Sequence, residues 1–143
     1  MSARARAYVA LGSNLGDRGQ YLALARDRLA RLPGTRLRAV SRVEETEPLG
    51  GLDQPRYLNQ MVELDTTLSP RDLLAECQRI EAEAGRKSRV RWAPRTLDID
   101  IVEYGHLELD EPGLRLPHPG IRTRAFWQRE LEELRGGRDT AGR

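Results

Sequence analysis

The sequence predicts an α+β fold of the ferredoxin-like βαββαβ type, in which an antiparallel four-stranded sheet carries two helices on one face, plus C-terminal additions. Two observations predict it. Four segments have the apolar patterns of strands and two have the 3.6-residue apolar spacing of helices, and they follow one another in the order β-α-β-β-α-β. The 143 residues fit one domain, expected over residues 1–135, with a disordered tail at 136–143.

The first strand and the first helix are predicted near the N-terminus. Residues 7–11 form a short apolar run typical of a buried strand. The loop that follows is rich in glycine, serine, asparagine and aspartate, which commonly precede a helix. A helix is expected from about Arg18 to Leu32, and Pro33-Gly34 ends it. Its apolar stripe consists of Tyr21, Ala25, Leu29 and Leu32.

Two further strands are predicted on either side of a long loop. Residues 35–43 alternate, with arginines on one face, and residues 57–68 alternate again, with Val62 on one face and Asn59 on the other. Residues 44–56 contain two prolines and two glycines, so they are expected to lack regular structure. A loop of this length in a compact domain is usually functional.

The second helix has a clear start signal. Ser69 is the expected N-cap, Pro70 suits the first helical position, and acidic Asp72 follows in the first turn. Gly85 is the expected C-terminal stop. Glu81 is interpreted as a surface acid, with the positioning of a cation or a guanidinium as the alternative. The buried stripe is expected to be Leu73, Cys77, Ile80 and Ala84.

The C-terminal part is expected to contain short strands, a rigid loop and a last helix. Residues 107–109 and 114–116 have the pattern of strand pieces around a Pro-Gly turn. Residues 117–120 form a proline-rich loop. The last helix is expected from about Thr123 to Leu134.

Asp98 and Asp100 are the strongest candidates for a metal site. They alternate with Leu97, Ile99 and Ile101, so both carboxylates lie on one face of a strand, with their α-carbons about 6.5 Å apart. This spacing lets two carboxylates converge on a hard cation such as Mg²⁺. It also creates repulsion that a positive charge must offset.

A basic segment precedes this carboxylate pair. Residues 86–95 contain no acid, and their cations are Arg86, Lys87, Arg89, Arg91 and Arg95. Carboxylates that hold Mg²⁺ beside arginines that hold phosphates predict a site for magnesium and a polyphosphate. A solvated loop is the simpler alternative. An RNA-binding domain of the same fold is another, which is disfavoured because two acids on the open sheet face would repel an RNA backbone.

Three of the seven aromatic residues, Tyr57, Trp92 and Phe126, are candidates for stacking on a flat heterocycle, with ordinary packing as the alternative. Tyr57 and Trp92 adjoin polar or charged loops rather than apolar runs. His118 lies between two prolines, and no nucleophilic serine or cysteine motif accompanies it, so a hydrogen-bonding role in the loop is favoured over that of a catalytic base.

Composition narrows the range of partners. The net charge of +2 and the pI near 9.0 do not by themselves indicate nucleic acid or a membrane. The single Cys77 cannot form a disulfide within the chain, and no Cys/His metal spacing exists. No apolar run approaches the length of a membrane span, and the N-terminus lacks a secretory signal, so a cytoplasmic location is expected.

Seven motifs occur in order over about residues 8–126, and the Arg-Trp-Ala-Pro-Arg-Thr-Leu-Asp-Ile-Asp block is the most specific of them. The motifs are Gly12-Ser13-Asn14-Leu15-Gly16, Thr46-Glu47-Pro48-Leu49-Gly50, Tyr57-Leu58-Asn59, Gln78-Arg79-Ile80-Glu81, Arg91 to Ile101, Pro117-His118-Pro119 and Arg124-Ala125-Phe126. Together they resemble the 6-hydroxymethyl-7,8-dihydropterin pyrophosphokinase family of folate biosynthesis.

The resemblance implies a ferredoxin-like fold and transfer of the β,γ-pyrophosphoryl group of ATP to the pterin hydroxymethyl oxygen, giving AMP. It implies that Asp98 and Asp100 hold two Mg²⁺ ions between ATP and the pterin. It also implies that Arg86 and Arg95 are cations of the phosphate site. The implied partners are ATP and the reduced pterin alone, bound by a monomer.

The same resemblance assigns residues to each substrate. Phe126 would stack on the pterin ring, Asn59 would hydrogen-bond its edge and Trp92 would close over it. The implied pterin residues are Thr46, Leu49, Tyr57, Asn59, Trp92 and Phe126. The implied ATP residues are Gln78, Arg86, Arg89, Arg95, Ile101, His118 and Arg124.

The chain departs from the family pattern at three places. Ser88 occupies the position of a second loop arginine, with Arg89 one residue further on. Glu44 stands where an aromatic residue is common. Residues 127–131 are strongly charged where the family continues with an apolar segment. A pterin- and ATP-binding protein without activity is therefore the alternative to an enzyme.

Overall fold

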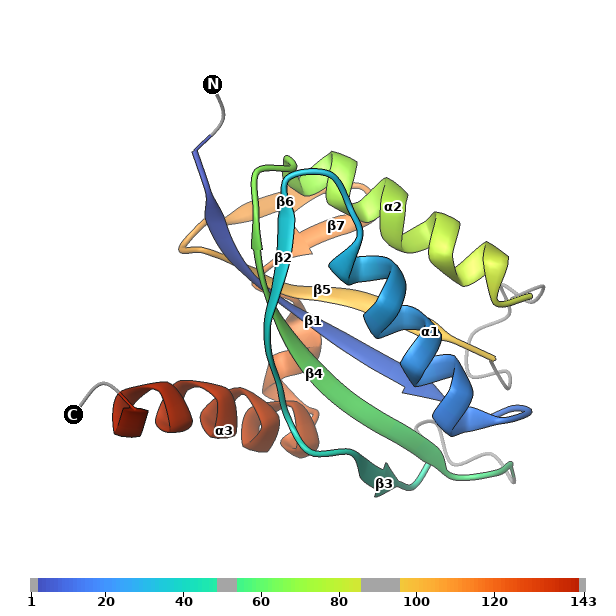
Figure 1. The fold of residues 1–143 in the computed structure, drawn as a ribbon. Helices are drawn as coiled ribbons and strands as arrows, with labels where there is room; N and C mark the ends of the chain where they lie inside the picture. The colour runs from blue at the N-terminus through green and yellow to red at the C-terminus, as the bar shows by residue number, and fades with distance from the viewer. Residues whose placement is uncertain (1–2, 49–53, 86–95, 142–143) are drawn as a thin grey trace.

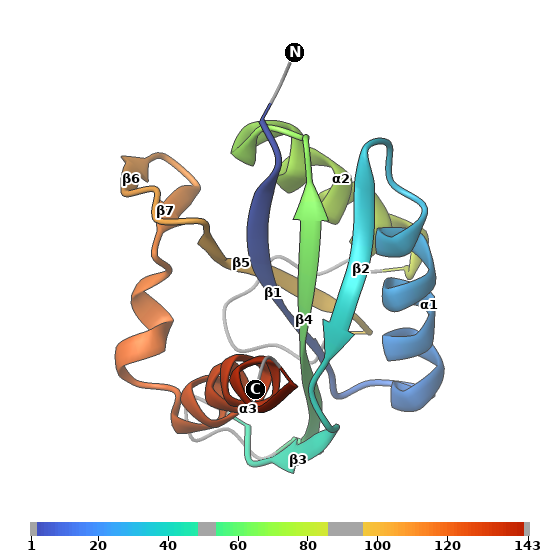
Figure 2. The ribbon, with the colours of Figure 1, turned by 60° about the vertical axis from the view of Figure 1, so that its left-hand side comes forward.

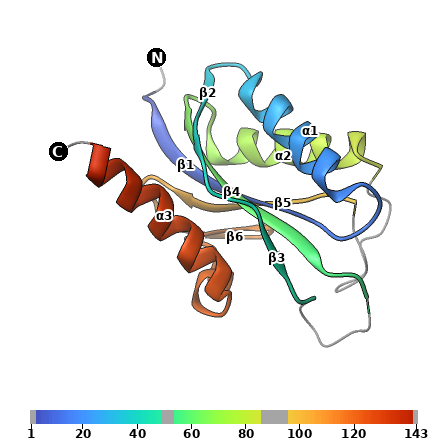
Figure 3. The ribbon, with the colours of Figure 1, turned by 60° about the horizontal axis from the view of Figure 1, so that its bottom comes forward.

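The computed structural model describes residues 3–48, 54–85 and 96–141. Helices α1 and α2 lie side by side on one face of a sheet, and α3 crosses the opposite face (Figures 1 and 3). This arrangement confirms the predicted α+β class. The elements are β1 (Ala5–Ser13), α1 (Arg18–Ala30), β2 (Thr35–Val40), β3 (Glu44–Thr46), β4 (Tyr57–Thr66), α2 (Pro70–Glu83), β5 (Asp98–Tyr104), β6 (Leu109–Glu111), β7 (Leu114–Leu116), the 3₁₀ helix η2 (Pro119–Arg122) and α3 (Ala125–Ala141).

The main sheet is antiparallel throughout. Its order is β2-β4-β1-β5, and β3 pairs separately with β4. The prediction that residues 44–56 lack regular structure is therefore wrong at β3. Glu44 pairs with Asn59 and Thr46 with Tyr57. β3 is therefore a strand through its pairing with β4, which its own residue pattern does not predict.

The core between the sheet and the first two helices has the composition that the alternating patterns predict. Val62 of β4 and Ile99 of β5 are buried in it, as are the α2 residues of the predicted stripe. In α1 the buried residues are Leu22, Ala25 and Leu29, whereas Tyr21 is only half-buried. The predicted α1 stripe is therefore wrong at Tyr21, where Leu22 is the buried residue, and at Leu32, which is half-buried and lies beyond the end of the helix at Ala30.

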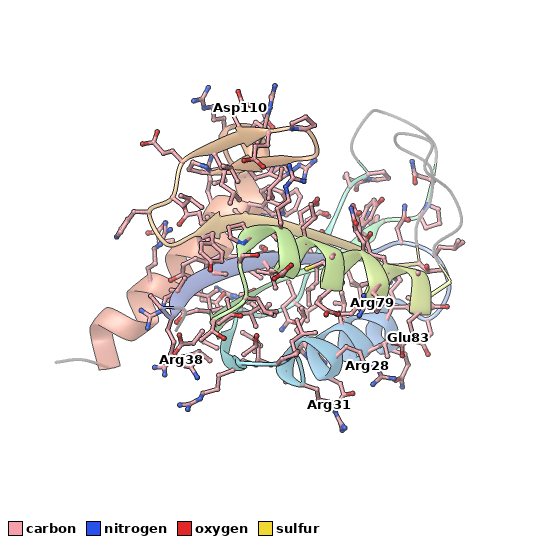
Figure 4. All side chains as sticks on the ribbon, turned by 90° about the horizontal axis from the view of Figure 1, so that it is seen from above. Arg28, Arg31, Arg38, Arg79, Glu83 and Asp110 are labelled. Carbon is pink, nitrogen blue, oxygen red and sulfur yellow. The ribbon has the colours of Figure 1, made fainter. Side chains whose placement is uncertain are left out.

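Helix α2 begins and ends as its sequence indicates. The Ser69 hydroxyl accepts a hydrogen bond from the Asp72 backbone N–H at 3.1 Å, and Pro70 is in the first turn. Gly85, just beyond the helix, has φ of +81°, a conformation that glycine adopts without a Cβ penalty. Outside the core, Figure 4 places Arg28 of α1 beside Glu83 of α2, and their side chains form an ion pair.

A second, smaller core lies between the sheet and α3 (Figure 2). Its buried members are Tyr8, Ala10, Met61, Val102, Trp127, Leu131 and Leu134. Helix α3 continues to Ala141, past the predicted end at Leu134, so the expected tail at 136–143 is helical as far as Ala141. Gly136 and Gly137 disfavour a helix by about 1 kcal/mol each but do not exclude it.

Two short strands and a turn connect the sheet to α3. β6 and β7 pair with each other as a separate two-stranded sheet, close to their predicted positions. The Leu116–Pro117 peptide bond is cis, and the predicted rigid loop contains the 3₁₀ helix η2. In the described part of the chain, no helix has the length and apolar composition needed to cross a membrane.

Candidate active site

The Asp98 and Asp100 carboxylates lie on the sheet face that points away from α1 and α2. In the register of β5 against β1, Asp98 lies opposite Gly12 and Asp100 opposite Ala10. Both aspartates are half-buried, while the intervening Ile99 is buried in the core on the other face. The alternation along β5 therefore places the two carboxylates on one sheet face and the core residue on the other, as the sequence predicts.

A first cavity of about 200 Å³ opens beside the two aspartates. Its wall combines residues of four strands with the start of α3. The predicted site residues that it brings together are Thr46, Tyr57, Asn59, Asp98, Asp100, Arg124 and Phe126. A flat apolar and aromatic wall beside hydrogen-bonding groups suits a polar heterocycle.

A second cavity of about 540 Å³ lies on the other side of Asp100, between α2, β5 and the β6–β7 turn. The predicted site residues in its wall are Asp100, Ile101 and His118. Arg115 of β7 adds a cation that sequence reasoning missed. Asp100 thus belongs to the walls of both cavities.

Arg124, His118 and Trp127 form an ordered cluster next to Asp100. An Arg124 nitrogen lies 3.8 Å from one Asp100 oxygen, and His118 Nε2 lies 3.9 Å from the other. The Arg124 guanidinium stacks over the buried Trp127 ring at 4.3 Å, and the His118 ring meets it edge-on at 4.9 Å. Trp127, which the sequence analysis treated only as part of a charged segment, therefore fixes both polar side chains.

His118 is neutral near pH 7 in this setting. Burial, and then the nearby Arg124 cation, lower the pKa of His118 to about 4, against a smaller opposing effect of Asp98. His118 Nδ1 accepts a hydrogen bond from the Gly120 backbone N–H at 2.9 Å. The neutral ring therefore carries its proton on Nε2, the atom that faces Asp100.

The family of the chain follows from its sequence. The protein-family model for 7,8-dihydro-6-hydroxymethylpterin-pyrophosphokinase (HPPK) matches residues 8–136 of this chain. The chain belongs to the HPPK family. This match confirms the resemblance that the motifs indicate.

Three relatives, each named 2-amino-4-hydroxy-6-hydroxymethyldihydropteridine pyrophosphokinase, are similar to this HPPK chain over most of their lengths. The protein of Pseudomonas aeruginosa is 49% identical over 129 residues, which are 90% of this chain and 80% of the relative. That of Methylorubrum extorquens is 44% identical over 129 residues, or 90% and 82% of the two chains. That of Bacillus subtilis is 42% identical over 128 residues, or 90% and 77%.

Glu81 supports the candidate site in a way that its sequence position did not indicate. Its interpretation as a surface acid is wrong, because its exposure is 4% and its carboxylate accepts the Ile99 backbone N–H at 2.7 Å. The bond fixes the β5 backbone between Asp98 and Asp100. Spacing in α2 could have suggested burial, since Glu81 lies four residues after the buried Cys77.

Gly12 and Gln54 are further cavity residues that sequence reasoning missed. A Cβ on Gly12 would lie 3.1 Å from Asn59 Oδ1 and 3.4 Å from the Tyr57 ring. Gln54 is held at the rim by the Asn14 amide, which donates to its side-chain oxygen at 2.7 Å. The glycine therefore leaves room for the two side chains at the cavity floor.

The remaining predicted site residues lie elsewhere. Gln78 is exposed on α2 and lines neither of the two cavities. Five others fall outside the described residues: Leu49, Arg86, Arg89, Trp92 and Arg95. The basic segment of the HPPK site thus stays a prediction.

The donor set fits Mg²⁺ bound together with a polyphosphate. Within the described ranges, no cluster of three or more His, Cys, Asp or Glu side chains could hold a metal by itself. Two half-buried carboxylates are what Mg²⁺ uses when phosphate oxygens and waters complete its coordination. Among the described residues, Arg124 supplies a cation that offsets the repulsion between the two aspartates.

Proposed function

We propose that this chain transfers the pyrophosphoryl group of ATP to the hydroxymethyl group of 6-hydroxymethyl-7,8-dihydropterin, giving AMP and the pterin diphosphate. The observation that carries the proposal is that Asp100, with Asp98 beside it, lies where two cavities meet. The first cavity takes the pterin and the second takes ATP. Membership of the HPPK family supports both assignments.

We propose that Asp98 and Asp100 would hold two Mg²⁺ ions. Held there, the ions would supply positive charge next to the phosphates and to the reacting oxygens. The hydroxymethyl oxygen forms a bond to the β-phosphorus, the bond from that phosphorus to the α,β-bridging oxygen breaks, and the hydroxyl proton is released. Arg86 and Arg95 stabilise the charge on the transferred group.

The pterin is positioned by the first cavity. Phe126 stacks on the ring system, and Tyr57 lines the same pocket. The Asn59 amide donates to the Thr46 hydroxyl, which orients its carbonyl oxygen toward the floor beside Gly12. That oxygen accepts a hydrogen bond from the pterin edge. Leu49 and Trp92 complete the pocket.

ATP is positioned by cations and by a neutral imidazole. Arg124 lies in the wall of the first cavity beside Asp100 and reaches a phosphate oxygen at the junction with the second cavity, while stacked on Trp127. Ile101 and the His118 Nε2–H, in the wall of the second cavity, contact the nucleotide. The other ATP contacts in this proposal are Gln78, Arg86, Arg89 and Arg95. The βαββαβ core acts as a monomeric ferredoxin-like scaffold within a single domain, and the order β2-β4-β1-β5 supports this type.

AMP formation tests the proposal. The purified chain is incubated with ATP, Mg²⁺ and the reduced pterin, and the nucleotides are separated by chromatography. We expect one AMP per pterin diphosphate formed. Binding of pterin and ATP without AMP would instead identify an inactive binding protein. Binding of RNA with a steep salt dependence, and no binding of pterin, would identify an RNA-binding domain.

Aspartate variants test the assignment of the site. Asp98→Asn and Asp100→Asn should each lower kcat by orders of magnitude, because each removes a carboxylate that holds Mg²⁺. Their unfolding midpoints should stay close to that of the parent chain, since both side chains are half-buried. Glu103→Gln is the matched control: it removes an acid of the same strand that lines neither of the two cavities. Parent-like turnover in either aspartate variant would refute the metal assignment.

A further inference from the structure

Two glutamates from distant parts of the chain meet between β3 and α3. Glu44 begins β3, and Glu130 lies in the second turn of α3. Glu130 is 1% exposed, and the preceding residue, Arg129, donates to Glu44, which places the two glutamates next to each other. Both residues belong to places where the sequence departs from the HPPK family pattern, so two departures that look independent in the sequence are one contact in space.

The contact lacks the donors that two carboxylates would need. Within the described part of the chain, neither Glu130 oxygen has a hydrogen-bond donor, and neither does Glu44 Oε2. The other Glu44 oxygen accepts from Arg129 Nε at 3.1 Å. Arg129 donates to Glu44 and not to Glu130, so a direct hydrogen bond between the two adjoining carboxyl groups requires that one of them carry a proton.

The surroundings favour that proton. Burial, and then the hydrogen bond and charge of Glu44, raise the pKa of Glu130 to about 9. Arg129 opposes this effect and Glu133 adds to it. Glu133 is itself bonded to Arg42, whose backbone N–H donates to it at 3.0 Å. Glu130 thus stays neutral near pH 7.

The glutamate pair connects the two walls of the first cavity. Glu44 lies opposite Asn59 in the sheet register, two residues before Thr46. Glu130 lies one helical turn after Phe126, on the helix that carries the buried Trp127. A bond between Glu44 and Glu130 therefore fixes the distance between the aromatic wall and the hydrogen-bonding wall.

We propose that Glu130 is a positioning residue of the pterin site, a neutral carboxylic acid that donates a hydrogen bond to Glu44 and so holds the start of α3 against β3. The proposal rests on the proposed function in one respect, that the first cavity takes the pterin. The role of Glu130 is to set the width of that cavity.

The first test asks whether the proton is present. In protein labelled with ¹³C at the glutamate carboxyl groups, the Glu130 signal, assigned by its loss in Glu130→Gln, should titrate near pH 9. Because the neutral form is favoured only in the folded chain, the parent should also lose stability relative to Glu130→Gln as the pH rises from 6 to 9. Glu132→Gln, which removes an exposed acid of the same helix, should keep the pH dependence of the parent.

The second test asks whether the pair positions the pterin. Glu130→Ala should raise the KM for pterin about fivefold, the equivalent of one ordinary hydrogen bond, and leave the KM for ATP unchanged. Glu130→Gln keeps a neutral donor toward Glu44 and should restore the parent KM. Glu132→Gln should match the parent in both constants.

Three results would overturn the proposal: a Glu130 carboxyl that titrates near pH 4, a Gln variant as impaired toward pterin as the Ala variant, or a parent-like pterin KM in Glu130→Ala. If the Ala variant does not fold, the carboxyl titration and the Gln variant still decide. If the parent chain forms no AMP, the proposed function fails separately, and the titration still shows whether the pair shares a proton.

Discussion

At the scale of single residues, Gly12 leaves room in the first cavity, to which the proposed function assigns the pterin. Its φ is not in the left-handed region, so alanine suits its backbone and the effect of substitution is steric. In Gly12→Ala the new methyl group would press on the Asn59 carbonyl at 3.1 Å. We expect weaker pterin binding and unchanged ATP binding, measured by titration calorimetry.

Gly19→Ala provides the matched control for Gly12→Ala. A Cβ at Gly19 meets only the Asp17 carboxylate, at 3.9 Å, on the outer surface of α1. Alanine is the better helix former by about 1 kcal/mol, so this variant should gain stability and keep parent-like affinity for both substrates. Equal pterin affinity in the two variants would contradict the steric role of Gly12.

Glu81 offers a second residue-scale prediction. Glu81→Ala removes the acceptor of the Ile99 N–H and should cost about 1–3 kcal/mol of stability, the usual penalty for an unsatisfied buried donor. The β5 backbone between the aspartates should loosen, so kcat should fall as well. Urea unfolding and steady-state kinetics measure the two effects.

Glu83→Gln is the control for Glu81. It removes one charge from the same helix, but its ion pair with Arg28 lies on the surface, where such pairs contribute little. Glu81→Gln keeps an acceptor oxygen and should lie between the parent and Glu81→Ala. A parent-like kcat in Glu81→Ala would show that β5 holds its aspartates without this bond.

At the scale of elements, the N-cap of α2 should matter for stability alone. Ser69→Ala removes the hydroxyl that accepts the Asp72 N–H, and loss of such a cap typically costs about 1 kcal/mol. Ser69→Asp keeps an acceptor and should restore the unfolding midpoint. Because Ser69 lines neither of the two cavities, the kinetic constants of both variants should match those of the parent.

Local patterns explain why most elements were predictable. Alternation identified β4 and β5, and the Ser69-Pro70 start with the Gly85 stop identified α2, because these signals act within a few neighbouring residues. β3 was missed because its pairing with β4 is non-local and its flanks contain prolines and glycines.

The site was predictable where it follows strand alternation and less so where it depends on tertiary contacts. Asp98 and Asp100 share a face because of the strand period. Burial of Glu81 depends on where α2 lies against β5, and the ordering of Arg124 depends on the Trp127 ring. No short window of sequence contains those relations.

At the scale of the whole molecule, the packing of helices on both faces of the sheet places the two aspartates at the edge of the second core. The core under α1 and α2 covers one sheet face, and α3 covers the other only over residues such as Tyr8 and Met61. The aspartates lie beyond that contact and stay half-buried. The fold thereby keeps a polar site next to two apolar cores.

The buried Cys77 is a probe of global unfolding. Its exposure is 0%, and burial, followed by the nearby Glu81 and Asp100, raises the pKa of its thiol well above the usual range. A thiol reagent should therefore react only with unfolded chains, and the labelling rate should rise with urea in parallel with the unfolded fraction. A fast labelling rate that is independent of urea would show that α2 opens locally.

The position of Asp100 in both cavity walls has a consequence for inhibition. A charged ligand in one cavity changes the electrostatic potential at the Asp100 carboxylate, and so changes the affinity of the other cavity for a charged ligand. Thermodynamic linkage makes this effect mutual. Since the cavities meet at one side chain, a short tether can join a group for each. Once one group of such a tethered compound is bound, its second group meets the other cavity at an effective concentration that a mixture of the two separate ligands does not reach.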